Sequence, residues 1–271
     1  MQKPAKRKIV KLLLWLTLLY IAGGIAIYFL QDRFILQPKK LTADYQYSFQ
    51  LPFREINLPV NNDRNINIIQ FTVPDSIRKG VVLYYHGNKQ NVEHYASFAS
   101  NFTNNHYEVW MMDYPGFGKS TGVCTEETMY EDAALVYQMA RSGFAKDSII
   151  IYGKSLGTGI AAWLASVKDC RKLILESPYY SMDALMQHYL FAYPMHWLSK
   201  YHFPTNEYLP KVEVPVIIFH GTDDDIIPIK QSEKLKAIYP KAELIQIAGG
   251  NHNDLSNFPV FHEKLNELLK N

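Results

Sequence analysis

The sequence predicts an α/β domain with a mostly parallel central sheet flanked by helices, antiparallel strands at its start and one transmembrane helix before it. Three observations predict this fold class. From Val81 onward, continuous apolar runs alternate with helical segments, as in parallel strands that are buried on both faces. Before them, apolar residues alternate around an Asn/Asp turn at 61–63, which is typical of antiparallel strands. Residues 12–30 contain no charged side chain.

The amino-terminal segment divides into a basic tail (1–11), a transmembrane anchor (12–30) and a linker (31–44). A helix rises about 1.5 Å per residue, so the anchor can cross a bilayer. The alternative is a signal peptide whose cleavage would leave a secreted or periplasmic protein, since Ala22-Gly23-Gly24 faintly resembles a cleavage site. The apolar run continues to Leu30, where a mature secreted chain would already be polar, and this favours an uncleaved anchor.

Charge predicts the orientation of the anchor and excludes one class of partner. The tail holds five basic residues, whereas Arg33, Lys39 and Lys40 follow the anchor, so the positive-inside rule places the N-terminus in the cytoplasm and the domain outside it. The net charge is +2, from 28 basic and 26 acidic residues. Without those five, 23 basic residues stand against 26 acidic ones, a net charge of −3. The domain therefore has no electrostatic reason to bind nucleic acid.

Residues 45–271 are predicted to form a single domain. Tyr45, Tyr47 and Phe49 alternate, and an apolar run follows the turn at 61–63, so both segments are predicted to be strand-like. The parallel strands are expected at Val81–His86, Glu108–Asp113, Ser148–Tyr152, Lys172–Glu176, Val216–His220 and Glu243–Ile247. Helices are expected at 91–104, 126–142, 156–168, 230–238 and 256–270. A cap insertion rich in aromatic residues, 178–210, interrupts this pattern, and we expect it to be helical and to roof the site.

Metal and disulfide chemistry have little support in the sequence. Cys124 and Cys170 do not form a Cys-x-x-Cys pair, so we expect two free structural thiols. His188, His196 and His202 in the cap lack close helical ligand spacing, so no metal site is predicted. No cofactor is expected.

Ser155 is the candidate nucleophile. It lies in Gly153-Lys154-Ser155-Leu156-Gly157, directly after a predicted strand and before a predicted helix. A sharp strand-to-helix turn of this kind holds the serine hydroxyl out at the sheet edge and needs glycine on both sides. A serine needs a histidine to accept its proton and a carboxylate to orient that histidine. The loop after the strand at 243–247 offers His252, which is preferred to His262 in the last helix.

Three aspartates, Asp223, Asp224 and Asp225, follow the strand at 216–220, and one of them is expected to be the acid. Glu176, at the end of its own strand, is the runner-up acid. The two remaining aspartates are expected to cap the turn, and His86 and His220 to brace turns.

These motifs resemble the α/β-hydrolase superfamily, in order and over residues 50–270. The family's oxyanion turn resembles His86-Gly87-Asn88, its Asp-Tyr-x-Gly-x-Gly-x-Ser stretch resembles residues 113–120, and its elbow matches 153–157. Its acid motif, His-Gly-x-x-Asp followed four residues later by Pro, aligns Asp224 with the acid. The resemblance implies a Ser155-Asp224-His252 triad and an oxyanion hole made by the backbone N–H groups of Asn88 and Leu156. The anchor and short cap are most similar to a membrane-anchored branch related to serine aminopeptidases and protein depalmitoylases.

The resemblance implies a membrane-anchored serine hydrolase that cleaves a carboxylic ester or thioester through an acyl-enzyme. Its substrate would be a small molecule or an acyl lipid. A peptidase, aminopeptidase or amidase with the same triad is the first alternative, although only Asp183 and Glu207 in the cap could hold a substrate ammonium. A non-catalytic anchored binding module is the second. The sequence leaves the oligomeric state open.

Overall fold

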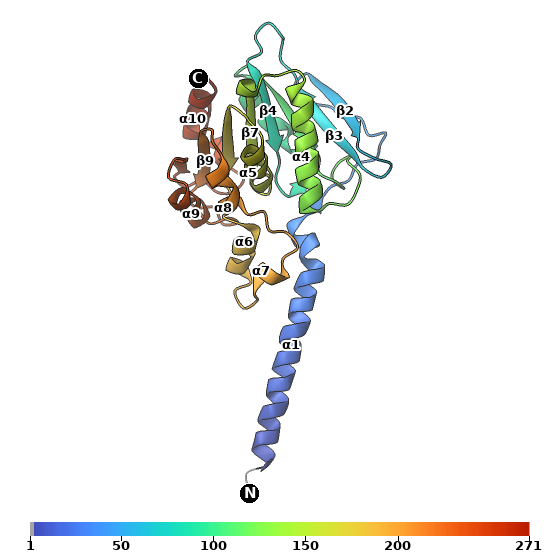
Figure 1. Ribbon diagram of the computed structural model, residues 1–271, viewed down its shortest axis with the longest axis vertical. Coiled ribbons are helices and arrows are strands. Elements are labelled where there is room, and N and C mark those ends of the chain that lie inside the picture. Colours follow the sequence, from blue (N-terminus) through green and yellow to red (C-terminus); the bar gives the residue numbers. More distant parts are fainter. Residues whose placement is uncertain (1–2, 271) are drawn as a thin grey trace.

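The computed structural model describes residues 3–270, so residues 1–2 of the predicted tail and residue 271 of the predicted domain lie outside the described part. A long helix, α1 (Lys3–Ile35), stands away from a domain in which helices cover both faces of a sheet (Figure 1). Over Lys6–Ile35, α1 is long and apolar enough to cross a membrane by length and composition. The predicted anchor lies inside α1, and the predicted linker begins within its last turns.

The central sheet has eight strands in the order β10-β9-β8-β7-β4-β6-β3-β2. The β2–β3 and β3–β6 pairs are antiparallel and the other pairs are parallel, which confirms the predicted sheet. The strands are β2 (Phe53–Pro59), β3 (Asn65–Phe71), β4 (Gly80–Tyr85), β6 (Tyr107–Met112), β7 (Ile149–Lys154), β8 (Lys172–Glu176), β9 (Val216–Gly221) and β10 (Glu243–Ile247). The six predicted parallel strands are all present, with ends shifted by no more than two residues.

The opening of the domain differs from the prediction. Tyr45, Tyr47 and Phe49 form no strand, and the first strand of the sheet is β2. The three rings pack against one another, and Phe49 also lies edge-on to Phe71 of β3. Their alternation therefore reflects aromatic packing on the sheet and not a ladder of backbone hydrogen bonds.

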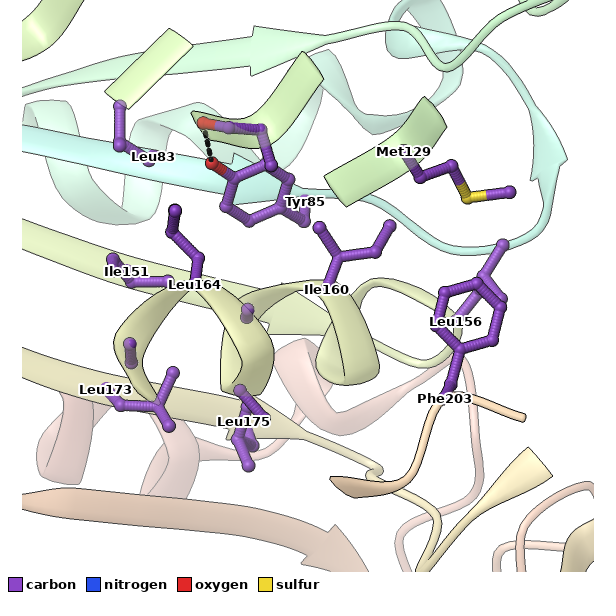
Figure 2. Packing of buried hydrophobic residues seen from close by; sticks show 14 of the residues in the cluster. Leu83, Tyr85, Met129, Ile151, Leu156, Ile160, Leu164, Leu173, Leu175 and Phe203 are labelled. Carbon is purple, nitrogen blue, oxygen red and sulfur yellow. Dashed lines mark hydrogen bonds between the residues drawn. The ribbon is translucent and has the colours of Figure 1, made fainter. Parts of the chain in front are cut away.

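The parallel strands are buried on both faces because successive side chains point to opposite layers. Ile149 and Ile151 of β7 belong to the core under α4 (Glu126–Arg141) and α5 (Gly157–Val167), part of which Figure 2 shows. Ile150 and Tyr152 belong to the core on the other face, together with Phe102 and residues of α10 (Pro259–Lys270). Two helical layers thus enclose the sheet.

Most helices follow the predicted bounds. A capping box between Thr125 and Thr128 starts α4, and α9 (Lys230–Ile238) has the predicted bounds. The helix predicted at 91–104 is three pieces, α2 (Val92–Tyr95), η1 (Ala96–Ala99) and α3 (Ser100–Thr103), because the winding tightens while the backbone stays helical. The helix predicted at 256–270 begins as η4 (Leu255–Asn257) and continues as α10, with Pro259 in the first position that tolerates it. Another short turn, η2 (Lys146–Ser148), precedes β7.

The cap consists of α6 (Met182–Tyr189), α7 (Met195–Leu198), α8 (Thr205–Tyr208) and η3 (Leu209–Lys211). The Ser181 hydroxyl caps α6 by accepting from the Ala184 N–H. Figure 1 shows α6 and α7 on the side of the domain where α1 joins it, with α7 beside the last turns of that helix. The chain leaves α1 through β1 (Gln37–Pro38), which pairs with β5 (Lys89–Gln90), so the end of the helix is fixed to the domain.

Candidate active site

Ser155 occupies a strained turn between β7 and α5. Its φ is +52°, in the left-handed region that non-glycine residues rarely adopt, and its N–H donates to the Glu176 carbonyl at 2.9 Å. The flanking glycines are required by close packing. A Cβ on Gly157 would lie 2.1 Å from the carbonyl oxygen of Tyr85, and one on Gly153 would lie 2.5 Å from that of Gly157. The turn therefore fixes the Ser155 hydroxyl at the carboxyl edge of the sheet.

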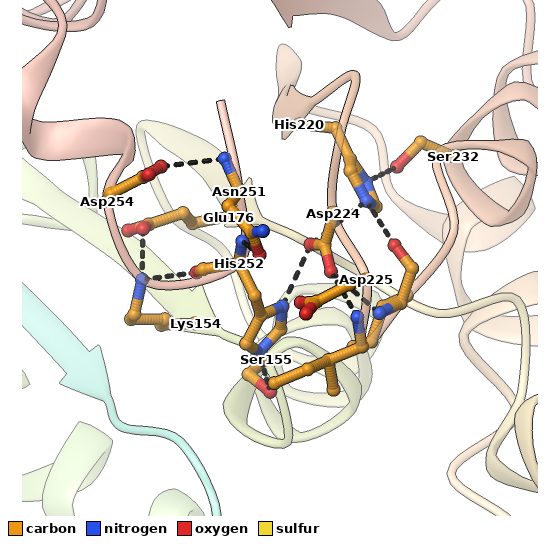
Figure 3. Close-up of polar contacts among 12 residues, drawn as sticks. Lys154, Ser155, Glu176, His220, Asp224, Asp225, Ser232, Asn251, His252 and Asp254 are labelled. Atoms are coloured by element: carbon orange, nitrogen blue, oxygen red, sulfur yellow. Dashed lines mark hydrogen bonds and ion pairs between the residues drawn. The ribbon is translucent and has the colours of Figure 1, made fainter. Parts of the chain in front are cut away.

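The structure brings Ser155, His252 and Asp224 into one hydrogen-bonded chain (Figure 3). His252 Nε2 lies 2.9 Å from Ser155 Oγ, and His252 Nδ1 lies 2.8 Å from Asp224 Oδ2. The three residues come from loops after β7, β10 and β9, and all three are buried. A serine, a base and an orienting acid are thus in the geometry that nucleophilic catalysis needs.

Asp224 is held by more than the histidine. Its Oδ1 accepts from the backbone N–H groups of Ile226 and Ile227 at 3.0 and 2.7 Å, and its Oδ2 lies 3.3 Å from His220 Nε2. Burial alone would raise the pKa of Asp224. The hydrogen bonds from His220 and His252 outweigh burial, and the pKa of Asp224 lies well below its usual value. Asp224 is therefore a carboxylate throughout the physiological range.

The two bracing histidines lie where the sequence predicts them. His220 Nδ1 contacts Ser232 Oγ at 2.6 Å, and its Nε2 contacts the Ile227 carbonyl at 2.7 Å, so the ring ties the Asp224 turn to α9. His86 is buried, and its Nδ1 lies 2.7 Å from the Gly87 carbonyl. Sequence reasoning did not anticipate that His220 also reaches the Asp224 carboxylate.

The other candidates have different roles. Glu176 forms a buried ion pair with Lys154 and accepts from the Tyr152 hydroxyl, and Lys154 Nζ lies 3.4 Å from the His252 carbonyl. Glu176 thus supports the His252 loop indirectly, because it holds Lys154 in place beside that loop. Asp223 and Asp225 are exposed. His262 is partly buried, and its ring contacts the Ser256 carbonyl at 2.6 Å. Both cysteines are free thiols, and burial raises the pKa of each to about 12, so neither is an activated nucleophile.

The two predicted oxyanion donors belong to residues that line the same cavity as Ser155. Among residues 3–270, no hydrogen bond uses the backbone N–H of Asn88 or Leu156. Asn88 is fixed from its other groups, because its side-chain amide donates to the Ile35 carbonyl at 2.9 Å and its carbonyl accepts from the Gln37 N–H at 2.9 Å. Two free N–H groups next to the nucleophile can stabilise a developing oxyanion.

A cavity of about 510 Å³ opens on Ser155, and most of its wall is apolar. Its lining comes from α1, the loop that holds Asn88, the turn at Ser155, the cap and the turn after Asp224. The residues are Ile27, Phe34, Ile35, Asn88, Ser155, Leu156, Tyr179, Met182, Leu185, Met186, Tyr189, Leu190, Asp225, Ile226 and Ile227. The participation of α1 has no counterpart in the sequence prediction.

Asp183, His196 and His202 come together in the cap, where the sequence predicts no metal site. Asp183 Oδ2 lies 3.0 Å from His196 Nδ1 and its Oδ1 lies 2.9 Å from His202 Nδ1, while His188 is not part of the group. The three side chains could hold one divalent cation such as zinc. Each contact is also an ordinary histidine–carboxylate hydrogen bond, so the arrangement does not require a metal.

Comparison with known proteins identifies relatives of this chain. A family model described as "Serine aminopeptidase, S33" matches residues 76–208. The alpha/beta hydrolase domain-containing protein aho-3 of Caenorhabditis elegans is 31% identical over 195 residues, which cover 69% of this chain and 57% of that one. Protein 17C of Xenopus tropicalis, with the same domain name, is 30% identical over 69% of this chain and 61% of its own length. The chain therefore spans about three fifths of the length of these curated relatives.

Solved structures share the fold. An esterase from Pyrococcus furiosus has a TM-score of 0.67 at 17% identity, covering 87% of this chain and 97% of that one. A soluble variant of the monoglyceride lipase of Saccharomyces cerevisiae has a TM-score of 0.62 at 19% identity, covering 84% and 98%. The order of the sheet, the serine elbow and these relatives agree, and the chain belongs to the α/β-hydrolase superfamily.

Proposed function

We propose that this protein is a membrane-anchored serine hydrolase that cleaves a carboxylic ester or thioester through an acyl-enzyme. The observation that carries the proposal is the Ser155–His252–Asp224 chain of hydrogen bonds at the base of an apolar cavity of about 510 Å³. An apolar wall beside the nucleophile suits an acyl chain, whose burial contributes about 0.8 kcal/mol per methylene.

In the proposed reaction, Ser155 Oγ attacks the acyl carbon while His252 Nε2 accepts the hydroxyl proton. Asp224 keeps the proton of the neutral ring on Nδ1 and stabilises the imidazolium. The N–H groups of Asn88 and Leu156 receive the oxyanion, and His252 then protonates the departing alkoxide or thiolate. Water, deprotonated by the same histidine, releases the acid and restores Ser155. No step needs a cofactor.

The anchor belongs to the same proposal. α1 exposes an apolar surface from Ile9 to Leu30, which would be costly in water and suits lipid. The basic tail favours an N-terminus in the cytoplasm and a domain on the opposite side.

An aminopeptidase is the second candidate, since the matched family model carries that description and Asp225 on the cavity lining could receive a substrate ammonium. The cap carboxylate considered from sequence, Asp183, contacts two histidines instead, and Glu207 is exposed and not on the cavity lining. Amide hydrolysis would use the same triad on a poorer leaving group.

The test is covalent labelling of the detergent-solubilised protein with a fluorescent fluorophosphonate. Wild type should be labelled, and Ser155→Ala and His252→Ala should not. Ser177→Ala is the matched control, because Ser177 is also buried at a strand end with φ +50° and should leave labelling intact. A separate, unlabelled sample of wild type is then assayed on p-nitrophenyl esters, acyl thioesters and aminoacyl amides. A folded wild type that takes no label would contradict the proposal, and faster turnover of amides would favour the aminopeptidase.

A further inference from the structure

The cap is seated on the anchor helix over three turns. The Tyr20 ring stacks on Tyr193 with centroids 4.6 Å apart, and the Tyr20 hydroxyl donates to the Ala192 carbonyl at 2.8 Å. Further along α1, the Gln31 side chain donates to the Leu198 carbonyl at 3.0 Å. Between these contacts, a Cβ on Gly23 would lie 2.0 Å from Tyr193 Oη, so any larger residue there would force the Tyr193 ring to move. A contact of this kind, with small residues where another segment approaches closely, is typical of helix packing within membranes.

The position of these contacts along α1 indicates how deep the cap would lie in a bilayer that α1 crosses. Tyr20 lies eleven residues before Gln31, which is about 16 Å along a helix axis. From Leu12, where the predicted anchor begins, to Tyr20 the helix is only about 12 Å long, less than half of a hydrocarbon core of about 30 Å. That part alone is too short to cross the bilayer. If α1 spans, the part of the cap that touches Tyr20 must lie near the middle of the hydrocarbon core, and the cap must reach it through the leaflet on the side of the domain.

The cap tip, residues 189–198, has the side chains that such a position needs. Phe191 is 83% exposed and Trp197 is 84% exposed, which is unfavourable in water and favourable in the interfacial region of a bilayer. Between Asp183 and Lys200 the sequence has no Asp, Glu, Lys or Arg. Lys200 pairs with Asp32 at 2.7 Å, close to the end of α1, where headgroups and water would meet the chain.

The cavity that opens on Ser155 lies between the same two elements. Ile27, Phe34 and Ile35 of α1 line it on one side, and Leu185 and Met186 of α6 line it on the other. Asn88, which carries a proposed oxyanion N–H, is tied to the Ile35 carbonyl at 2.9 Å. The anchor is therefore fixed to the reacting centre as well as to the cap.

We infer that the cap tip is immersed in the leaflet on the side of the domain, and that a lipid acyl chain passes from this leaflet between α1 and α6 to Ser155. The inference rests on the proposed ester hydrolase and names its substrate class, a long-chain fatty-acid ester held in the bilayer. Passage between the two helices keeps the acyl chain in apolar surroundings, so its transfer to the site does not expose it to water.

The first experiment enlarges a side chain of α1 on the cavity wall, in the full chain reconstituted in phosphatidylcholine vesicles. Ile27→Trp replaces an isoleucine of the cavity wall with a bulkier indole ring. Leu30→Trp makes a similar change on the same helix, at a position that does not line the cavity. The assay compares kcat/KM for p-nitrophenyl palmitate and p-nitrophenyl acetate. We expect Ile27→Trp to lower the palmitate-to-acetate ratio about tenfold, which corresponds to the exclusion of about two methylene groups, and Leu30→Trp to leave it unchanged.

The outcomes separate this inference from the proposed function. If wild type takes the fluorophosphonate label and hydrolyses acetate, but Ile27→Trp has the same ratio as wild type, the route along α1 is wrong while the hydrolase proposal stands. If no ester is hydrolysed and no label is taken, the hydrolase proposal itself fails. An equal change in both variants would point to general damage to α1 and would also overturn the route.

The second experiment measures the depth of the cap tip. In a Trp15→Phe background, the tryptophans that remain are Trp110 and Trp163 in the domain and Trp197 in the cap. Phospholipids brominated on the acyl chains should quench a component of the fluorescence that disappears in Trp15→Phe/Trp197→Phe. Quenching that is the same in both variants would show that Trp197 is outside the leaflet and would overturn the immersion of the cap.

Discussion

Asp224→Asn is the substitution for which the structure predicts the largest effect with the smallest change in shape. Asp224 accepts two backbone N–H groups on Oδ1 and the His252 ring on Oδ2, whereas an asparagine has one acceptor and one donor. If the amide oxygen keeps the two N–H groups, its NH2 faces His252 Nδ1 and forces the ring proton onto Nε2. The ring then cannot accept the proton of Ser155.

The flipped amide is the costlier arrangement. It would place the NH2 against the N–H groups of Ile226 and Ile227, leaving two buried donors unpaired at about 1–3 kcal/mol each. The catalytically wrong tautomer should therefore dominate. By analogy with the serine triad, turnover should fall roughly 10⁴-fold, about 5.5 kcal/mol of transition-state stabilisation.

The assay is kcat/KM on p-nitrophenyl butyrate, together with the rate of fluorophosphonate labelling and the thermal midpoint. Asp223→Asn is the matched control, because Asp223 is in the same turn but exposed, and it should lose less than about twofold. The reasoning is refuted if Asp223→Asn is the inactive variant, or if Asp224→Asn keeps its fold and more than about a tenth of the activity.

Two further substitutions probe buried charge. Lys154→Met leaves Glu176 buried without its cation and should lower the free energy of unfolding, measured in urea, by about 3–5 kcal/mol. The double variant Lys154→Met/Glu176→Leu should recover most of that loss. A loss below about 1 kcal/mol in Lys154→Met would contradict the buried pair. Burial raises the pKa of Asp132 to about 6; Arg64 opposes this shift and Glu131 adds to it. The folded state therefore holds the Asp132 proton more tightly than the unfolded state does, and the contribution of Asp132 to the stability of the wild type declines as the pH rises from about 4 to about 6. Asp132→Asn should escape that decline, and thermal midpoints across pH 4–8 should show its advantage growing over this window; a constant difference would show that Asp132 does not titrate there.

The parts of the fold that the sequence predicts well are those whose signal is local. The parallel strands are continuous apolar runs between turn residues. Because they are buried on both faces, nearly every one of their residues must be apolar. The elbow is equally local, since Gly153 and Gly157 are forced by contacts within one strand-to-helix turn and the neighbouring strand. The early aromatic segment misled because Tyr45, Tyr47 and Phe49 alternate for packing and not for pairing.

The choice among the three aspartates could not come from local signal alone. Asp223, Asp224 and Asp225 have the same side chain in adjacent positions, and only Asp224 turns inward to meet His220, His252 and two backbone N–H groups. Family resemblance singled out Asp224, and the geometry gives the physical reason, since a carboxylate buried at this position is stable only with several donors around it.

The contact between α1 and the cap could not be predicted from the sequence, for a different reason. A pair of glycines in an apolar helix fits both a cleavage site and a packing site. The apolar run to Leu30 favours an uncleaved helix, but nothing near Gly23 in the sequence shows what packs against it. That partner, Tyr193, lies far along the chain in a segment that has no periodic pattern linking it to α1. A bulkier residue at position 23 would displace the Tyr193 ring. In the proposed membrane-anchored form, Asp, Glu, Lys or Arg in the cap tip would oppose its entry into lipid beside α1. α1 supplies part of the cavity wall as well as the proposed anchor, so replacing it with an unrelated transmembrane helix should, if the proposal is right, retain membrane attachment but lose that wall.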